Sequence, residues 1–107
     1  MLLQQIANGE IMEKFKSESV EKLFEVVMNL SSIDECYKFF EDICTVKELQ
    51  DLAQRLEVAI LLSEGKNYNL ISSEVGASSA TISRVNKCLM YGSGGYESAI
   101  KRLKGEI

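Results

Sequence analysis

The chain has 107 residues, of which 46% are hydrophobic and 26% charged, and its net charge is −4. This length fits one domain, residues 1–107, and neither a membrane-spanning run nor a secretory signal is present, so we expect a cytoplasmic protein without a membrane partner. Histidine is absent and the carboxylates are scattered along expected helix faces, which argues against catalytic residues and against an enzyme.

Residues 1–18 carry a mixed pattern that leaves two interpretations open. Their apolar residues are compatible with a short helix interrupted near Asn8 and Gly9. They are equally compatible with an arm that becomes ordered only on a partner.

Residues 19–65 are expected to form three helices that serve in dimerisation. Apolar residues recur at helical spacing in residues 19–30, and Ser32 with Glu35 forms a capping box for a second helix. Thr45 with Glu48 forms another, opening a long helix over about 46–64 that should end at Gly65. The wide apolar stripes on these helices favour a core or a dimer interface, carried by Val20, Leu23, Phe24, Tyr37, Phe40 and Leu56.

Residues 68–91 match a helix-turn-helix. Apolar positions fall at helical spacing on both sides of Gly76, where the first helix must stop, and glycine adopts a left-handed conformation at little cost. Ser78 or Ser79 is expected to cap the second helix, over about 79–91. An ordinary helical hairpin would share this pattern.

The outer face of the second helix favours a DNA-binding helix-turn-helix over an ordinary helical hairpin. Its residues are small, hydroxylated or basic, whereas a merely solvated face would be richer in Glu and Lys. We expect base or phosphate contacts from both helices, through Tyr68, Asn69, Ser72, Ser78, Ser79, Ala80, Thr81, Ser83, Arg84 and Lys87.

The charge is divided unevenly along the chain. From Lys66 onward, six basic residues against three acidic ones leave +3, so the earlier part must carry −7 of the total of −4. This asymmetry indicates a basic surface on an acidic body, as a nucleic-acid-binding protein would have.

The C-terminal part contains a glycine-rich turn at residues 92–95. No strand precedes it and no Lys-Ser/Thr pair follows, so a hinge is favoured over a phosphate-binding loop. A short helix is expected over 96–104. With no proline and no alternating pattern, the fold class is all-α.

Cys36, Cys44 and Cys88 lack the spacing of metal ligands. We expect no metal site, and we expect these cysteines to be buried small hydrophobic residues in a reducing compartment.

The run GASSATISR at residues 76–84 and the wider block over 52–96 resemble the tryptophan repressor superfamily, most of all its YerC/YecD group. The similarity extends over about residues 19–96. The resemblance implies a Trp-repressor-like multi-helix domain that forms an intertwined homodimer, with helix-turn-helix segments projecting from a shared core.

The resemblance also implies an effector site. Arg84 matches an arginine that packs against the tryptophan ligand in the repressor, Arg55 lies near the place of a second one, and Cys88 stands where the repressor has serine. However, Val85 replaces a glycine that leaves room for the indole, and a thiol is a poor partner for an ammonium group. Tryptophan is therefore disfavoured as a cofactor, which leaves another effector or none.

Together these features predict a homodimeric, sequence-specific DNA-binding transcriptional regulator, a repressor, that reads a pseudo-palindromic operator in double-stranded DNA. The alternative is a helical protein-interaction module that kept the fold and lost DNA binding. The scarcity of basic residues in 68–75 favours that alternative, and the hydroxyl-rich face of 78–84 opposes it.

Overall fold

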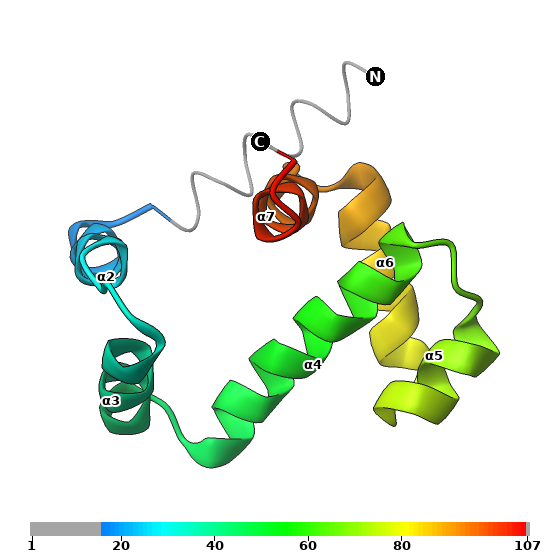
Figure 1. Cartoon of the computed structure of the whole chain (residues 1–107), viewed down its shortest axis with the longest axis horizontal. Helices are drawn as coiled ribbons and strands as arrows, with labels where there is room; N and C mark the ends of the chain where they lie inside the picture. The colour runs from blue at the N-terminus through cyan, green and yellow to red at the C-terminus, as the bar shows by residue number, and fades with distance from the viewer. Residues whose placement is uncertain (1–15, 107) are drawn as a thin grey trace. The chain divides into compact units, whose positions relative to one another are not determined.

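The computed structural model describes residues 16–106, and this part of the chain is all-helical, as expected from the sequence. Predictions for residues 1–15 lie outside the described residues. The helices are α2 (Glu18–Met28), α3 (Ile33–Ile43), α4 (Val46–Ser63), α5 (Tyr68–Val75), α6 (Ser79–Tyr91) and α7 (Gly95–Leu103) (Figure 1). Within residues 16–106 no helix is long and apolar enough to cross a membrane.

The chain divides into two compact units between Leu49 and Gln50. The N-terminal unit contains α2, α3 and the first residues of α4, and the C-terminal unit contains the rest of α4 with α5, α6 and α7. The single domain predicted from the sequence over residues 1–107 remains a proposal.

The helices of the N-terminal unit begin at polar caps. Ser17 accepts a hydrogen bond from the backbone N–H of Val20, and Ser32 accepts one from that of Glu35 at 3.1 Å. The Glu35 carboxylate reaches back to the N–H and the hydroxyl of Ser31, both at 2.6 Å, one residue before the position that a standard capping box would use. These hydrogen bonds lower the pKa of the Glu35 carboxyl.

Helix α4 has the capping box that the sequence predicts. The Glu48 carboxylate accepts from the N–H of Thr45 at 2.9 Å, while the Thr45 hydroxyl accepts from the N–H of Glu48 at 3.1 Å. At the other end Gly65 is left-handed, and the N–H groups of Gly65 and Lys66 bond to the carbonyls of Leu62 and Leu61. This pair of bonds is the Schellman motif, so the predicted glycine cap is confirmed.

Among residues 16–106, all the buried hydrophobic residues lie in the C-terminal unit. This core brings together residues from α4, the α5–α6 segment and α7, and partly buried side chains such as Leu62 and Tyr96 pack around it. Figure 1 shows α4 lying beside α6. The core residues are Val58, Ala59, Ile71, Ala77, Ile82, Val85 and Ile100.

No residue of α2 or α3 is buried. Their apolar stripes are present but open to solvent in the single chain: Met28 is 83% exposed, Ile33 77% and Tyr37 60%. An apolar groove in this unit is lined by Ile33, Cys36, Tyr37, Phe40 and Leu49.

The prediction that all three cysteines are buried is wrong. Cys36 and Cys44 are half-buried, and Cys88 is exposed. Cys88 lies on α6 three residues after the buried Val85, but it points to the edge of the core, toward a pocket.

Candidate nucleic-acid interface and the pocket beneath it

The segment predicted as a helix-turn-helix consists of two helices joined by a turn of three residues. Asn67 caps α5 by accepting from the N–H of Leu70 at 2.8 Å. Gly76 ends α5 with a φ of +76°, in the left-handed region that glycine tolerates best. Ser78 caps α6 and accepts from the N–H of Thr81 at 3.2 Å. Because the two helices are fixed by caps on both sides of the turn, their outer faces are held in a defined orientation.

The inner faces of α5 and α6 are tied to the core. Ile71 and Ile82 are fully buried and Ala77 in the turn is 2% exposed. Burial of these residues turns the opposite faces of both helices outward. Apart from Thr81, which is half-buried, every residue predicted to contact DNA is exposed: Tyr68, Asn69, Ser72, Ser78, Ser79, Ala80, Ser83, Arg84 and Lys87.

The hydroxyl groups of Ser78 and Thr81 are engaged with each other. Besides capping α6, Ser78 Oγ donates to Thr81 Oγ1 at 3.1 Å. Both residues therefore have a local structural role in addition to the DNA contacts predicted for them. Ser79 and Ser83 are exposed residues of the same helix.

A pocket of about 200 Å³ lies where α4, α6 and the start of α7 meet. It brings together all three residues predicted for an effector, Arg55, Arg84 and Cys88. The other residues that line it are Thr81, Val85 and Tyr96. Val85 is 2% exposed, so this lining residue is also part of the buried core.

Tyr96 is the pocket residue that sequence reasoning missed. Burial raises the pKa of its phenol and Cys88 adds to the rise, while the positive charges of Arg55 and Arg84 act in the opposite direction. Tyr96 enters the pocket because the chain reverses at the glycine-rich turn before α7. The sequence signal for this position is an aromatic residue directly after the glycine-rich turn, two positions after Gly94.

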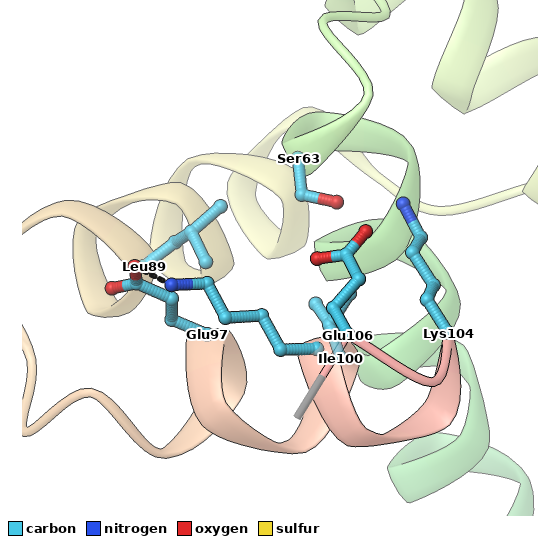
Figure 2. Close-up of a pocket in the computed structure, with 7 residues that line it drawn as sticks. Ser63, Leu89, Glu97, Ile100, Lys104 and Glu106 are labelled. Carbon is cyan, nitrogen blue, oxygen red and sulfur yellow. Dashed lines mark ion pairs between the residues drawn. The ribbon is translucent and has the colours of Figure 1, made fainter.

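A larger cavity, of about 410 Å³, lies between the C-terminal end of α4, α6 and α7 (Figure 2). Leu89 and Ile100 form its apolar part, and charged groups surround them. Lys101 pairs with Glu97 at 3.2 Å, and Lys104 pairs with Glu64 at 3.6 Å. None of the residues predicted for DNA or effector binding lines this cavity. Among residues 16–106 no group of three or more potential metal ligands is found.

Comparison with known proteins identifies the family. The model of the family described as Trp repressor protein matches residues 18–104. The uncharacterized protein YerC of Bacillus subtilis (strain 168) is 50% identical over 92 residues, which cover 86% of this chain and 88% of YerC.

Two solved structures share the fold. A candidate Trp repressor from Staphylococcus aureus is 42% identical, with a TM-score of 0.84 over 87% of this chain and 93% of that one. A TrpR-like protein from Eubacterium eligens ATCC 27750 is 48% identical, with a TM-score of 0.83 over 86% of this chain and 95% of that one. The resemblance inferred from residues 52–96 is confirmed, and the chain belongs to the Trp repressor family, a family of DNA-binding regulators.

Proposed function

We propose that this protein is a sequence-specific transcriptional repressor that reads a pseudo-palindromic operator with α5 and α6. The observation that carries the proposal is the outer face of α6, which exposes small, hydroxylated and basic side chains while Ile82 and Val85 anchor its inner face. A helix held in this way can enter the major groove without unfolding any part of the core.

Different side chains on this face have different roles in the proposal. Ser79, Ala80 and Ser83 face base edges, since short side chains allow close approach. Thr81, Arg84 and Lys87 hold phosphates, and Tyr68, Asn69 and Ser72 add contacts from α5. Ser78 caps α6 and so orients its N-terminus. Because Ser78 is exposed, it also contacts the DNA backbone in this proposal.

The proposed repressor is a homodimer. In the single chain, α2 and α3 leave large apolar side chains open to solvent, including Phe24 at 57% and Tyr37 at 60% exposure. A second copy would remove this surface from water, which is favourable by about 25 cal/mol per Å². Two identical helix-turn-helix segments related by two-fold symmetry would read half-sites about one helical turn apart.

Arg55, Arg84 and Cys88 are the proposed effector-binding residues. Their pocket carries two guanidinium groups, so it favours an anionic effector. Val85 occupies part of the space that an indole ring would need, so tryptophan is not the proposed effector.

The proposal is tested by selecting bound sequences from a random DNA pool and then measuring affinity for the selected site at several salt concentrations. Arg84→Ala is expected to weaken binding to all sequences alike and to reduce the magnitude of the salt slope by about one unit, because one phosphate contact is lost. Ser83→Ala is expected to alter the preferred base at a cost of about 1–3 kcal/mol.

Lys38→Ala is the matched control. It removes the same charge from an exposed residue of α3 that pairs with Asp34, so affinity and salt slope should stay unchanged. If Arg84→Ala behaves like Lys38→Ala in a folded protein, the proposed interface is wrong.

The competing function is a protein-interaction module. The observation that favours it is that α5 contains no basic residue and carries Glu74 on its surface. A heparin column at low salt separates the two functions, because strong retention is expected of a DNA-binding surface alone.

A further inference from the structure

Four side chains of α6 that line the 200 Å³ pocket fall on one helical stripe. Thr81, Arg84, Val85 and Cys88 are three, four and seven positions apart, so they share one face. Arg55 approaches from α4 and Tyr96 from α7. The thiol of Cys88 therefore shares a small cavity with two guanidinium groups contributed by two different helices.

The three cysteines differ in surroundings. Cys36 is half-buried in an apolar groove of the N-terminal unit, and Cys44 is half-buried at the end of α3. Cys88 is exposed, and its cavity is cationic. A negatively charged reagent would thus be drawn to Cys88 and not to the other two thiols, because opposite charges raise the local concentration of a ligand.

We infer that Cys88 is a modification site for small disulfides that carry carboxylate groups. The sulfur of Cys88 attacks one sulfur of the incoming disulfide, a new S–S bond forms and the old one breaks. The other half leaves as a thiolate that takes up the proton lost by Cys88, so Cys88 is oxidised and the leaving half is reduced. Arg55 and Arg84 hold the carboxylates of the group that stays attached.

The consequence for DNA rests on the proposed function. Arg84 lines the pocket and also belongs to the exposed face of α6. A carboxylate attached at Cys88 would pair with the Arg84 guanidinium and add negative charge beside the phosphate contact. Modification should therefore weaken DNA binding, and a reducing agent should restore it.

The chemical part of the test needs no DNA. The full chain is incubated separately with oxidised glutathione, an anionic disulfide, and with cystamine, a cationic one, and the modified cysteine is located by peptide mass mapping. For each disulfide, the rate of reaction with Cys88 is divided by its rate with a peptide that contains a free cysteine. This normalised rate should be about tenfold higher for the anionic disulfide than for the cationic one. This preference should shrink in 1 M salt.

Arg55→Gln removes one guanidinium group and leaves the exposed face of α6 unchanged, so it should reduce the preference of Cys88 for the anionic disulfide. Cys88→Ser should abolish the modification. Equal normalised rates for the two disulfides, or reaction at Cys36 or Cys44 ahead of Cys88, would overturn the inference. In the second part, the modified protein should bind DNA at least about tenfold more weakly, because one charge-assisted contact to a phosphate is lost. Should the unmodified protein fail to bind DNA, the proposed function fails while the chemical part still decides the modification site.

Discussion

The two units of this chain use similar helices in opposite ways. In the C-terminal unit, side chains such as Ile71 and Ile82 are completely buried by their own chain. In the N-terminal unit, α2 and α3 have clear apolar stripes, yet no residue of either helix is buried. Helices of 11 residues are too short to be stable in water without packing. The C-terminal unit therefore contains its own core, whereas α2 and α3 need another surface to cover their apolar stripes.

The largest expected effect is on assembly. If a second copy covers α2 and α3, the protein is an obligate dimer whose unfolding midpoint rises with protein concentration. Replacing both Phe24 and Tyr37 by Asp would bury unpaired charges at that interface and should yield monomers in sedimentation experiments. Asn69→Asp introduces one such carboxylate on the exposed face of α5, away from the apolar stripes, so that variant should stay dimeric. A stable, folded wild-type monomer at micromolar concentration would contradict the expectation.

A matched pair of isoleucines sharpens the contrast between the units. Ile82→Ala creates a cavity in a fully buried site and should lower the free energy of unfolding by about 2–5 kcal/mol. Ile33 is 77% exposed in the single chain, so Ile33→Ala should cost less than about 0.5 kcal/mol if nothing covers it. Denaturant unfolding at two protein concentrations checks both. A larger, concentration-dependent cost for Ile33→Ala would reveal the covering surface directly.

Two glycines of the C-terminal unit test the turn that orients α6. An added Cβ would meet no atom within 4 Å at Gly76 or at Gly95, so alanine causes no steric clash at either position. Gly76 has a φ of +76°, and Gly76→Ala should therefore destabilise by about 1–2 kcal/mol. Gly95 starts α7 without a positive φ, and Gly95→Ala should instead stabilise by about 0.4–1 kcal/mol. Thermal unfolding would compare the two; equal shifts would show that the left-handed turn is dispensable.

The units should also respond differently to acid. Hydrogen bonds to Ser31 lower the pKa of Glu35, and those to Thr45 lower the pKa of Glu48, both from an ordinary value of 4.5. A lowered pKa in the folded state gives stability that is present above pH 4.5 and is lost as the pH falls through the folded value.

Both glutamates lie in the N-terminal unit, whereas Asn67 and Ser78, which cap α5 and α6, do not titrate in this range. Amide hydrogen exchange between pH 5 and pH 3 should show α3 and α4 losing protection at their N-termini before α5 and α6 do. Glu35→Gln and Glu48→Gln should make this loss less dependent on pH. Simultaneous loss in all four helices would contradict the assignment.

The smallest expected effect is that of tryptophan. Val85 lines the pocket, and in the proposed function its side chain takes space that an indole ring would need. Millimolar tryptophan should therefore shift neither the melting temperature nor the DNA affinity. Val85→Gly should allow a tryptophan-dependent rise in melting temperature, with Val85→Ala as a control of intermediate size. A clear tryptophan-dependent rise in the melting temperature of the wild-type protein would show that the pocket already accommodates an indole.

Local signals explain how much of the fold could be predicted. The bounds of α5 and α6 follow from Gly76, from Ser78 and from the glycine after Tyr91, each of which acts on its immediate neighbours. The cap at Gly65 and the capping box at Thr45 are equally local. The exposed residues of the α6 face follow from helical periodicity once the inward positions are recognised.

What the sequence could not provide depends on distant contacts. The exposure of Cys88 and the place of Tyr96 are set by how α7 returns toward α4 and α6 after a turn whose φ and ψ angles the sequence leaves open. The apolar stripe that contains Phe24 could be recognised from its spacing, but the spacing does not say whether the same chain covers it. Glu35 reaches Ser31 and not Ser32, a choice between adjacent N–H groups that capping-box statistics do not resolve.

The core of the C-terminal unit is built from consecutive helices joined by short turns, and this has a consequence for the order of folding. Contacts between neighbours in sequence close small loops, so they form quickly and independently of protein concentration. Encounter of two chains is slower and depends on concentration. We therefore expect refolding to show a fast phase that protects the backbone of α5 and α6, followed by a second phase that accelerates as the protein concentration is raised.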